Sequence, residues 1–491
     1  MFQRRTTTAW TFAITSIGLF MVALDNLVVT TALPVIKVDL GSSLADLEWM
    51  VNAYTLTFAV LLLTGAALGD RFGRRRLFVI GLGIFTAGSA AAALAPSSEV
   101  LILARALQGL GGAIVTPLTL TILSAGVPLE RRALALGAWG GVGGLAVAVG
   151  PVVGGAIAQG VSWHWIFWLN VPIGIVAMAL AYFRLNETRG PEGNLDLGGL
   201  VLASGGLLGL VWGVIHGNDR GWTDVQVLAA LGAGALLLVG FYVWERRAAH
   251  PMLPLSMFRS RGFSAANGVS FLMYFGMFGS VFLLVQFFQL VQGLKPFEAG
   301  LRTLPWTAMP IFVAPAAGLL VPRIGARPII TTGMTLLAGG LAWIALVTTP
   351  TVDYALLVPG FVISGIGMGL FFAPIANVVL SAVQNHEEGK ASGANNAIRE
   401  VGGVFGVAVL ASVFSANGSY ATPASYVAGL VPAVWVGAAI VAVGALAALA
   451  IPARLGIVSG STTIDEIEAA VEGLFEAPAE REPAYARITN D

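Results

Sequence analysis

The sequence of 491 residues contains no cysteine, and only 11% of its residues are charged. Without cysteine there can be no disulfide bonds, cysteine-ligated zinc sites or thiol catalysis. A soluble chain carries about 25% charged residues, and the mean hydropathy here is +0.84. The 26 basic residues only balance the 26 acidic ones, so the basic excess of a nucleic-acid-binding protein is missing. These properties indicate an integral membrane protein that does not bind nucleic acid.

Motifs for nucleotide binding and metal-dependent catalysis are also missing. None of the lysines is followed by Ser or Thr, so the chain has no Walker-type phosphate loop. HExxH and GxSxG do not occur, and the 4 histidines are too dispersed to indicate a metal site. We therefore expect a protein that is not an enzyme, binds no metal or cofactor, and is not driven by ATP.

Fourteen hydrophobic segments are each long enough to span a membrane, which needs about 20 apolar residues. Two boundaries lie in charge-free stretches and rest on turn-forming residues, at 160–162 and 417–423. With the N-terminus in the cytoplasm, eighteen Lys and Arg residues fall inside and four outside, which predicts that both termini are cytoplasmic. The segments cover approximately residues 11–33, 47–69, 77–95, 100–126, 133–159, 163–183, 197–216, 225–244, 263–292, 303–322, 328–349, 354–381, 394–416 and 428–452.

The chain contains an internal repeat. The turn Asp70-Arg-Phe-Gly-Arg-Arg75 is echoed by Pro322-Arg-Ile-Gly-Ala-Arg327, an offset of 252 residues (322 − 70). Such repeats are common in transporters, whose substrate sites lie between the repeats near the middle of the membrane. We expect an all-α integral membrane fold with two six-helix bundles, an inserted helix pair and an acidic cytoplasmic tail. The predicted domains are 1–184, 263–453, 185–262 for the inserted pair with its linker, and 454–491 for the tail.

The turn after the second segment, from Leu68 to Arg75, resembles the cytoplasmic loop signature of the major facilitator superfamily. Together with the motifs described next, it identifies the chain as similar to the fourteen-helix drug:proton antiporter branch of that family. The resemblance implies that the acidic residue faces a helix N-terminus or an Arg, and that the last two arginines face the other half or lipid phosphate, which latches one conformation. The alternative is that the arginines only set the topology. The implied gating residues are Asp70, Arg71, Gly73, Arg74 and Arg75.

Two charges within the apolar segments point to proton coupling. Arg105 lies in a stretch that resembles the fourth-helix motif of the family, and Asp25 in one that resembles the first-helix motif of this branch. Asp25 lies about 12 Å from the outer end of its segment and Arg105 about 9 Å, so the two can share one depth. We expect Asp25 to bind a proton whose affinity changes when Arg105 pairs with it. A static ion pair that joins the two helices is the alternative.

Two further motifs concern the fifth and thirteenth segments. Gly150, Pro151, Gly154 and Gly155 resemble the antiporter motif of the family, although close helix packing alone also explains them. Glu400 stands where relatives usually carry Gln, directly after Arg399. It could be a second proton or cation site, or it could simply be neutralised by its neighbour.

The sequence offers only weak candidates for substrate binding. An aromatic pocket with a few polar groups and an acid suits amphipathic, often cationic molecules, although core packing is the favoured explanation for any single aromatic side chain. The candidates are Tyr54, Trp139, Tyr274, Gln286 and Gln289.

Taken together, the motifs predict a proton-coupled antiporter that exports hydrophobic drugs or antibiotics by alternating access, with the proton gradient as its energy source. An exporter of one endogenous metabolite or antibiotic is the alternative, and a channel or a membrane enzyme fits less well. The high ratio of Arg to Lys suggests a bacterial source. We expect a monomer in the bacterial plasma membrane whose partners are lipid, protons and small amphipathic substrates.

Overall fold

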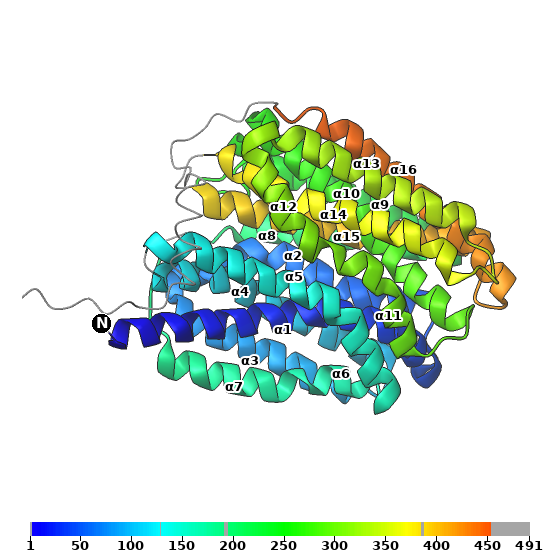
Figure 1. Cartoon of the computed structure of the whole chain (residues 1–491), viewed down its shortest axis with the longest axis horizontal. Helices are drawn as coiled ribbons and strands as arrows, with labels where there is room; N and C mark the ends of the chain where they lie inside the picture. Colours follow the sequence, from blue (N-terminus) through cyan, green and yellow to red (C-terminus); the bar gives the residue numbers. More distant parts are fainter. Residues whose placement is uncertain (1, 128, 191–194, 384–386, 453–491) are drawn as a thin grey trace, which may run out of the picture. The chain divides into compact units, whose positions relative to one another are not determined.

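The structure is a computed structural model that describes residues 2–127, 129–190, 195–383 and 387–452. These residues belong to one compact unit, 1–453, and the acidic tail falls outside the described residues. All regular elements described are helices (Figure 1). They are α1 (Phe2–Leu40), α2 (Leu44–Phe72), α3 (Arg74–Ala93), α4 (Ser98–Gly126), α5 (Leu129–Gly160), α6 (His164–Trp168), α7 (Asn170–Arg184), α8 (Leu197–Arg220), α9 (Val225–Glu245), the 3-10 helix η1 (Leu255–Arg259), α10 (Arg261–Leu290), α11 (Pro296–Thr307), α12 (Met309–Ile324), α13 (Ala326–Val347), α14 (Tyr354–Ser381), α15 (Glu388–Asn417) and α16 (Pro423–Ala448).

Among the described residues, 14 helical stretches are long and apolar enough to cross a membrane, which confirms the predicted number. α6 and α7 together form one of these spans, and α11 and α12 form another. Both boundaries that rested on turn residues are confirmed, since α5 ends at Gly160 and α15 ends at Asn417. We call the face at which α1 begins the N-terminal face, and the other the opposite face.

The tenth span differs from its predicted position, because it begins at Pro296 rather than near residue 303. The prediction placed the boundary at the charge of Arg302. In the structure the Arg302 side chain donates to Gln292 Oε1 at 3.0 Å, and its guanidinium lies 4.7 Å from the centre of the Tyr354 ring. Because protein groups stabilise this charge, the helix can start earlier, with proline in its first turn.

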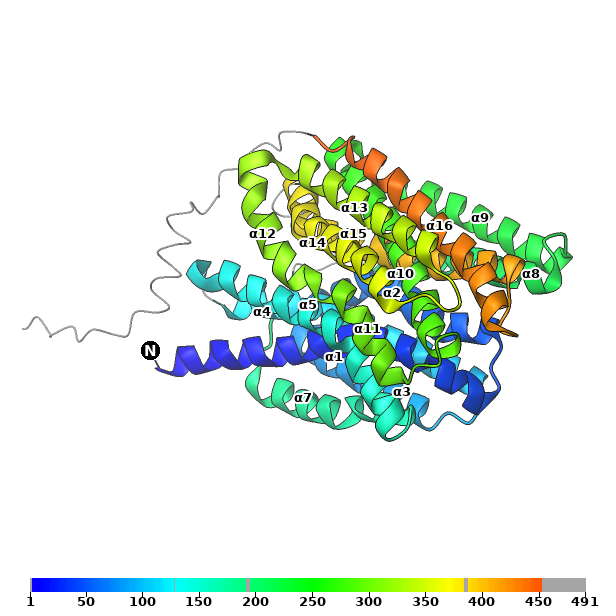
Figure 2. The same cartoon turned by 45° about the vertical axis from the view of Figure 1, so that its right-hand side comes forward.

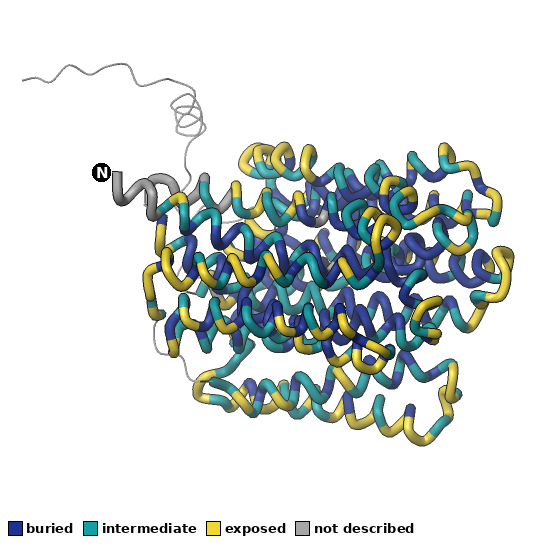
Figure 3. The backbone as a smooth tube through the Cα atoms, turned by 90° about the horizontal axis from the view of Figure 1, so that it is seen from below, coloured by how far each residue is buried: buried dark blue, intermediate teal, exposed yellow. Residues whose placement is uncertain are grey.

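The helices form two bundles, α1–α7 (blue to cyan in Figure 1) and α10–α16 (green to orange). Within the first, α2 and α3 pack against α4, and α1 packs against α5; within the second, α10 packs against α15 and α16, and α13 against α14. Buried residues follow the helix sides that face one another, and exposed residues lie at the periphery (Figure 3).

The inserted pair α8 and α9 runs side by side (Figure 2) and lies against a seam between the two bundles. α8 packs on both α2 and α15, where Val60, Val211 and Val404 belong to one buried apolar cluster. Near the opposite face, the Asn218 side chain donates to Ser412 Oγ at 3.0 Å. α8 therefore covers the seam between α2 and α15.

The second seam lies between α5 and α11, whose backbones approach closely toward the opposite face. A Cβ atom on Gly155 would stand 2.2 Å from the Pro296 carbonyl oxygen, and one on Gly300 would stand 2.3 Å from the Pro151 oxygen. Nearer the N-terminal face, a Cβ on Gly141 would meet no atom within 4 Å. The bundles are thus in backbone contact along this seam at the opposite face.

Candidate functional site

The centre of the first bundle contains a buried ion pair between Asp25 of α1 and Arg105 of α4. Their exposed fractions are 3% and 1%, and Arg105 Nη1 donates to Asp25 Oδ2. A charge within an apolar span is costly unless it is paired. The structure places the two residues in contact, as their equal depth predicted. Their role in proton coupling remains a prediction.

Two amide side chains complete the environment of Asp25. Asn170 Nδ2 and Gln108 Nε2 donate to Asp25 Oδ1, at 2.8 Å and 3.1 Å. Gln108 Oε1 accepts from Arg105 Nη1 at 2.8 Å, and its amide group also donates to Ser89 Oγ at 2.8 Å. The Asp25 carboxylate therefore receives hydrogen bonds from α4 and α7 on both oxygens, an arrangement that suits its ionised form.

Arg105 is held from the other side by α2. Its Nε donates to the Met50 carbonyl oxygen at 3.1 Å, and its guanidinium lies 4.3 Å from the centre of the Tyr54 ring. Tyr54 in turn donates its hydroxyl to the Val22 carbonyl oxygen at 3.2 Å. Gly109 allows α4 to come this close, because a Cβ there would stand 2.4 Å from the Tyr54 carbonyl oxygen.

Sequence reasoning did not assign a role to Gln108 or Asn170. Gln108 could have been found, because it follows Arg105 by three residues and so lies on the same face of a helix. Asn170 lies 145 residues from Asp25, and its only signal is an amide at the start of an apolar run. Tyr54, predicted to bind substrate, is buried beneath Arg105.

The predicted gating residues are engaged within the first bundle and the segment that follows it. Asp70 Oδ1 accepts from Arg74 Nε at 2.8 Å, while the backbone N–H groups of Arg75 and Arg76 donate to the Glu187 carboxylate at 2.9 and 3.2 Å. Among the described residues neither Arg74 nor Arg75 forms an ion pair with the other half, and lipid phosphate, their other expected partner, stays a prediction. Glu187 instead supplies an anion at the beginning of α3, close to both.

The junction between α2 and α3 requires a glycine at position 73 of the same motif. Gly73 has φ +109, a value that residues with a side chain rarely adopt, and it ends α2 and begins α3. The Arg71 guanidinium lies 5.3 Å from the centre of the Phe72 ring.

The Gly150–Gly155 motif contacts two different partners. Cβ atoms on Gly150 and Gly154 would stand 2.8 Å from Leu27 Cβ and 2.6 Å from the Val28 carbonyl oxygen, both on α1 just after Asp25. Gly155 and Pro151 face α11 of the second bundle instead, as described above. The motif therefore joins the helix that carries Asp25 to the contact between the bundles.

The acid on α15, Glu400, acts electrostatically on Tyr54, which lies against Arg105, but it forms no ion pair with the Asp25 cluster among the described residues. Glu400 Oε2 is buried without a hydrogen-bond partner, and no ion pair between Arg399 and Glu400 occurs in the described parts of the chain. Arg399 instead donates to Asn396 Oδ1, and its guanidinium lies 5.1 Å from the centre of the Tyr274 ring. Its charge still acts on Glu400, but neutralisation by direct ion pairing is not what the structure shows.

The remaining substrate candidates have different partners. Gln286 accepts from the Tyr420 hydroxyl at 2.8 Å, Gln289 donates across the bundles to the Thr31 carbonyl oxygen at 2.7 Å, and Trp139 Nε1 is buried without a partner. The two glutamines thus serve contacts near the opposite face.

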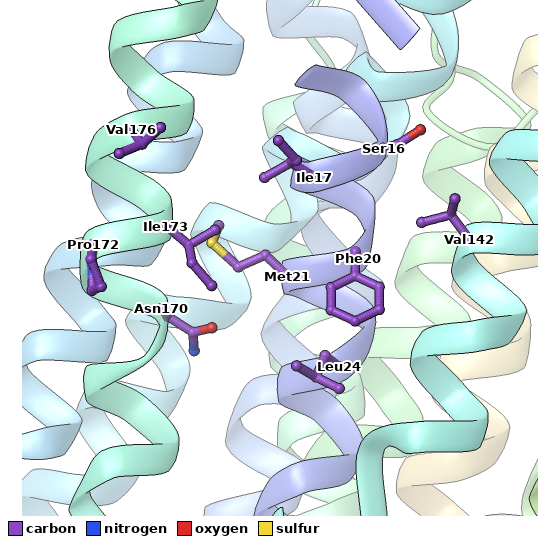
Figure 4. A pocket seen from close by; sticks show the side chains of 10 residues that line it. All are labelled: Ser16, Ile17, Phe20, Met21, Leu24, Val142, Asn170, Pro172, Ile173 and Val176. Carbon is purple, nitrogen blue, oxygen red and sulfur yellow. The ribbon is translucent and has the colours of Figure 1, made fainter. Parts of the chain in front are cut away.

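A cavity of about 590 Å³ lies elsewhere, between α1, α5 and α7 (Figure 4). Its lining is mostly apolar and includes Phe20, Leu24 and Ile173, with Asn170 among them. Since Asn170 binds Asp25, this apolar cavity reaches the edge of the buried ion pair.

The spans and the buried ion pair define a multi-pass helical membrane protein. A family model described as Major Facilitator Superfamily matches residues 15–407, and the chain belongs to this family. Its fourteen spans agree with the fourteen-helix drug:proton antiporter branch that the motifs indicate.

Two relatives with a known designation come from bacteria. The chain is 37% identical to the tetracenomycin C resistance and export protein of Streptomyces glaucescens over 80% of this chain and 74% of that one. It is 37% identical to the multidrug resistance protein Stp of Mycobacterium tuberculosis, over 83% and 76%. Among solved structures, an auto-inhibited POT family peptide transporter has the same fold, with a TM-score of 0.68 and 16% identity over 90% of this chain and 96% of that one. The chain is therefore a multi-pass protein of the plasma membrane.

Proposed function

We propose that this protein is a proton-coupled antiporter that exports hydrophobic, often cationic drugs or antibiotics, and that its N-terminal face is cytoplasmic. The observation that carries the proposal is the Asp25–Arg105 pair, a buried acid with a cationic partner next to an apolar cavity. The names of the two relatives, one a multidrug resistance protein, support the substrate class. The opposite face is then the outer face, closed along α5 and α11 in this conformation.

The mechanism follows from the competition between a proton and Arg105 for the Asp25 carboxylate. Ionised Asp25 is stabilised by Arg105, Gln108 and Asn170, and a proton on Asp25 weakens its bond to Arg105. Since Gly150 and Gly154 pack on α1 directly beyond Asp25, a shift of α1 on protonation reaches the α5–α11 contact. The proton gradient is the energy source in this proposal, and the protein acts as a monomer that needs no cofactor and catalyses no reaction.

Asp25→Asn is the decisive variant. Purified protein in liposomes should lose drug-driven proton movement, measured with an internal pH dye, because the neutral amide cannot take up or release the proton. Asp39→Asn is the matched control, since Asp39 is an exposed acid on the same helix that accepts from Trp163 Nε1. Proton-driven transport at the wild-type rate in Asp25→Asn would refute the coupling role.

Export of a single compound is the second candidate, and the relative named for tetracenomycin C favours it. Dye efflux and drug susceptibility in an efflux-deficient bacterial host distinguish the two candidates. Resistance to several unrelated compounds, lost with a protonophore, supports the multidrug antiporter. Resistance to one compound alone supports the dedicated exporter.

Glu400 is proposed as a second acid that acts on cationic substrates. Glu400→Gln should reduce transport of a divalent cationic substrate more than that of a monovalent one, because the second charge of the divalent substrate loses the Glu400 carboxylate as its partner. Equal transport of both substrates by the variant and the wild type would exclude this role.

A further inference from the structure

Another buried acid, Glu48, lies at the outer end of α2, outside the sites described above. Glu48 is 3% exposed, and its Oε2 atom has no hydrogen-bond partner. The ion pairs formed by the described residues join Asp25, Asp70 and Glu187 to arginines, and none involves Glu48. Its carboxyl group is thus buried without a cationic partner.

Asn52 lies one helical turn after Glu48 and therefore on the same face of α2. It is 0% exposed, and neither its Oδ1 nor its Nδ2 atom has a hydrogen-bond partner. Buried polar side chains are nearly always hydrogen-bonded, so two successive exceptions on one helix face mark a polar site rather than ordinary packing.

Groups from both bundles and from the inserted pair surround this site. Tyr420, in the turn before α16, interacts electrostatically with Glu48 and donates to Gln286 of α10. Lys37 at the end of α1 places its Nζ atom 3.1 Å from the centre of the Tyr420 ring. Asp219 of α8 carries a like charge that acts on Glu48. The site therefore lies where the halves meet at the outer face.

Other titratable groups at this end are engaged elsewhere. On α8, His216 stacks on Trp212 at 4.3 Å, and the Arg220 guanidinium lies 5.4 Å from the centre of the same ring. On α4, Glu99 is exposed, and on α1 Asp39 binds Trp163. None of these supplies Glu48 with a counter-charge.

We propose that Glu48, with Asn52, is a proton-binding site of the outer gate. An ionised carboxylate buried without a partner is strongly destabilised, whereas a protonated one is neutral and offers a donor to its surroundings. When the outer face opens, Tyr420 and Lys37 part, and Glu48 meets external water and ionises. The gate closes over Glu48 once a proton from outside has bound, so external acid drives the return to the conformation described here.

The proposal rests on the alternating-access function proposed above and is tested by accessibility rather than by transport. Because the chain has no cysteine, Thr31→Cys introduces a single thiol on α1 at a residue that is 0% exposed and whose carbonyl oxygen accepts from Gln289 across the bundles. A membrane-impermeant maleimide is applied from outside at a series of external pH values. Val161→Cys, made in a separate protein at a residue 71% exposed on the outer face, corrects for the pH dependence of the thiol reaction.

The labelling rate of Thr31→Cys, divided by that of Val161→Cys, should fall as external pH falls, by at most about tenfold per pH unit for one proton. Adding Glu48→Gln to both proteins should give a low ratio that does not change with pH, and Glu48→Asp should restore the change. Glu99→Gln and His216→Asn, which replace other titratable groups at this end, should leave the pH response unchanged. An undiminished labelling rate of Val161→Cys in the presence of each substitution shows that the protein is inserted with this turn outside, and a low rate at Thr31→Cys shows that the closed packing around α1 is kept.

A Glu48→Gln protein that keeps the full pH response overturns the proposal, as does a ratio that is constant with pH when Glu48 is present. Loss of the response in His216→Asn but not in Glu48→Gln assigns the titration to the histidine and also overturns it. These results are separate from a failure of drug antiport, since labelling requires no drug or proton transport. Labelling that depends on pH in a protein without drug:proton antiport would contradict the proposed function and support the gate.

Discussion

The contact between α5 and α11 gives the sharpest prediction, through Gly155→Ala and Gly300→Ala. Each added methyl group would stand 2.2 to 2.3 Å from a backbone carbonyl oxygen of the other bundle. A backbone atom cannot turn aside as a flexible side chain can, so the two helices must separate at the outer face. The substitutions should therefore destabilise the outward-closed conformation and leave the interior of each bundle unchanged.

The size of the effect follows from the cost of overpacking, which is about 1–3 kcal/mol for an added methyl group in a close contact. Such a cost changes the ratio of outward-closed to outward-open protein by about 5- to 150-fold. The two substitutions lie in the same short contact, so their effects should not add in the double variant.

Labelling of Thr31→Cys from outside measures this shift, and dye efflux measures its consequence for transport. Labelling should become faster and efflux slower in both variants. Gly160→Ala is the matched control, because a Cβ at this outer residue of α5 would meet no atom within 4 Å. If Gly155→Ala labelled and transported as Gly160→Ala does, the α5–α11 contact would not be the outer closure.

Two further predictions concern hydrogen bonds of the first bundle. Asn170→Leu leaves Asp25 Oδ1 with one amide donor instead of two, which should lower the unfolding free energy by about 1–3 kcal/mol; thermal unfolding in detergent measures the loss, and an unchanged Tm would show that this bond contributes little. Glu187→Ala removes the acceptor for two backbone N–H groups at the start of α3, and should destabilise that turn by about 0.5–2 kcal/mol. Faster hydrogen exchange at Arg75 and Arg76 would confirm the role of Glu187, and exchange at the wild-type rate would exclude it.

Helix number and the depth of the buried charges could be predicted because each depends on one segment at a time. The lengths of apolar runs gave fourteen spans, and counting residues from the helix ends put Asp25 and Arg105 at one depth. The predicted start of the tenth span was wrong, because the charge of Arg302 was taken as its limit. In the structure Gln292 and Tyr354 stabilise that charge. No single segment reveals those contacts.

The site was harder to predict because it depends on which helix faces meet. Asn170 reaches Asp25 only because α7 packs against α1. Gln286 and Gln289 were both predicted to line a substrate pocket. In the structure one binds Tyr420 and the other the backbone of α1, and spacing within one helix cannot show such partners.

The position of α8 makes the two seams of the molecule mechanically unequal. At one edge α8 packs on both α2 of the first bundle and α15 of the second, and so links the two bundles. At the other edge the bundles contact each other directly, through α5 and α11. Neither α8 nor α9 packs against α5 or α11 in the residues that the structure describes. We therefore expect a change of conformation to separate the bundles more at the α5–α11 edge than at the α2–α15 edge.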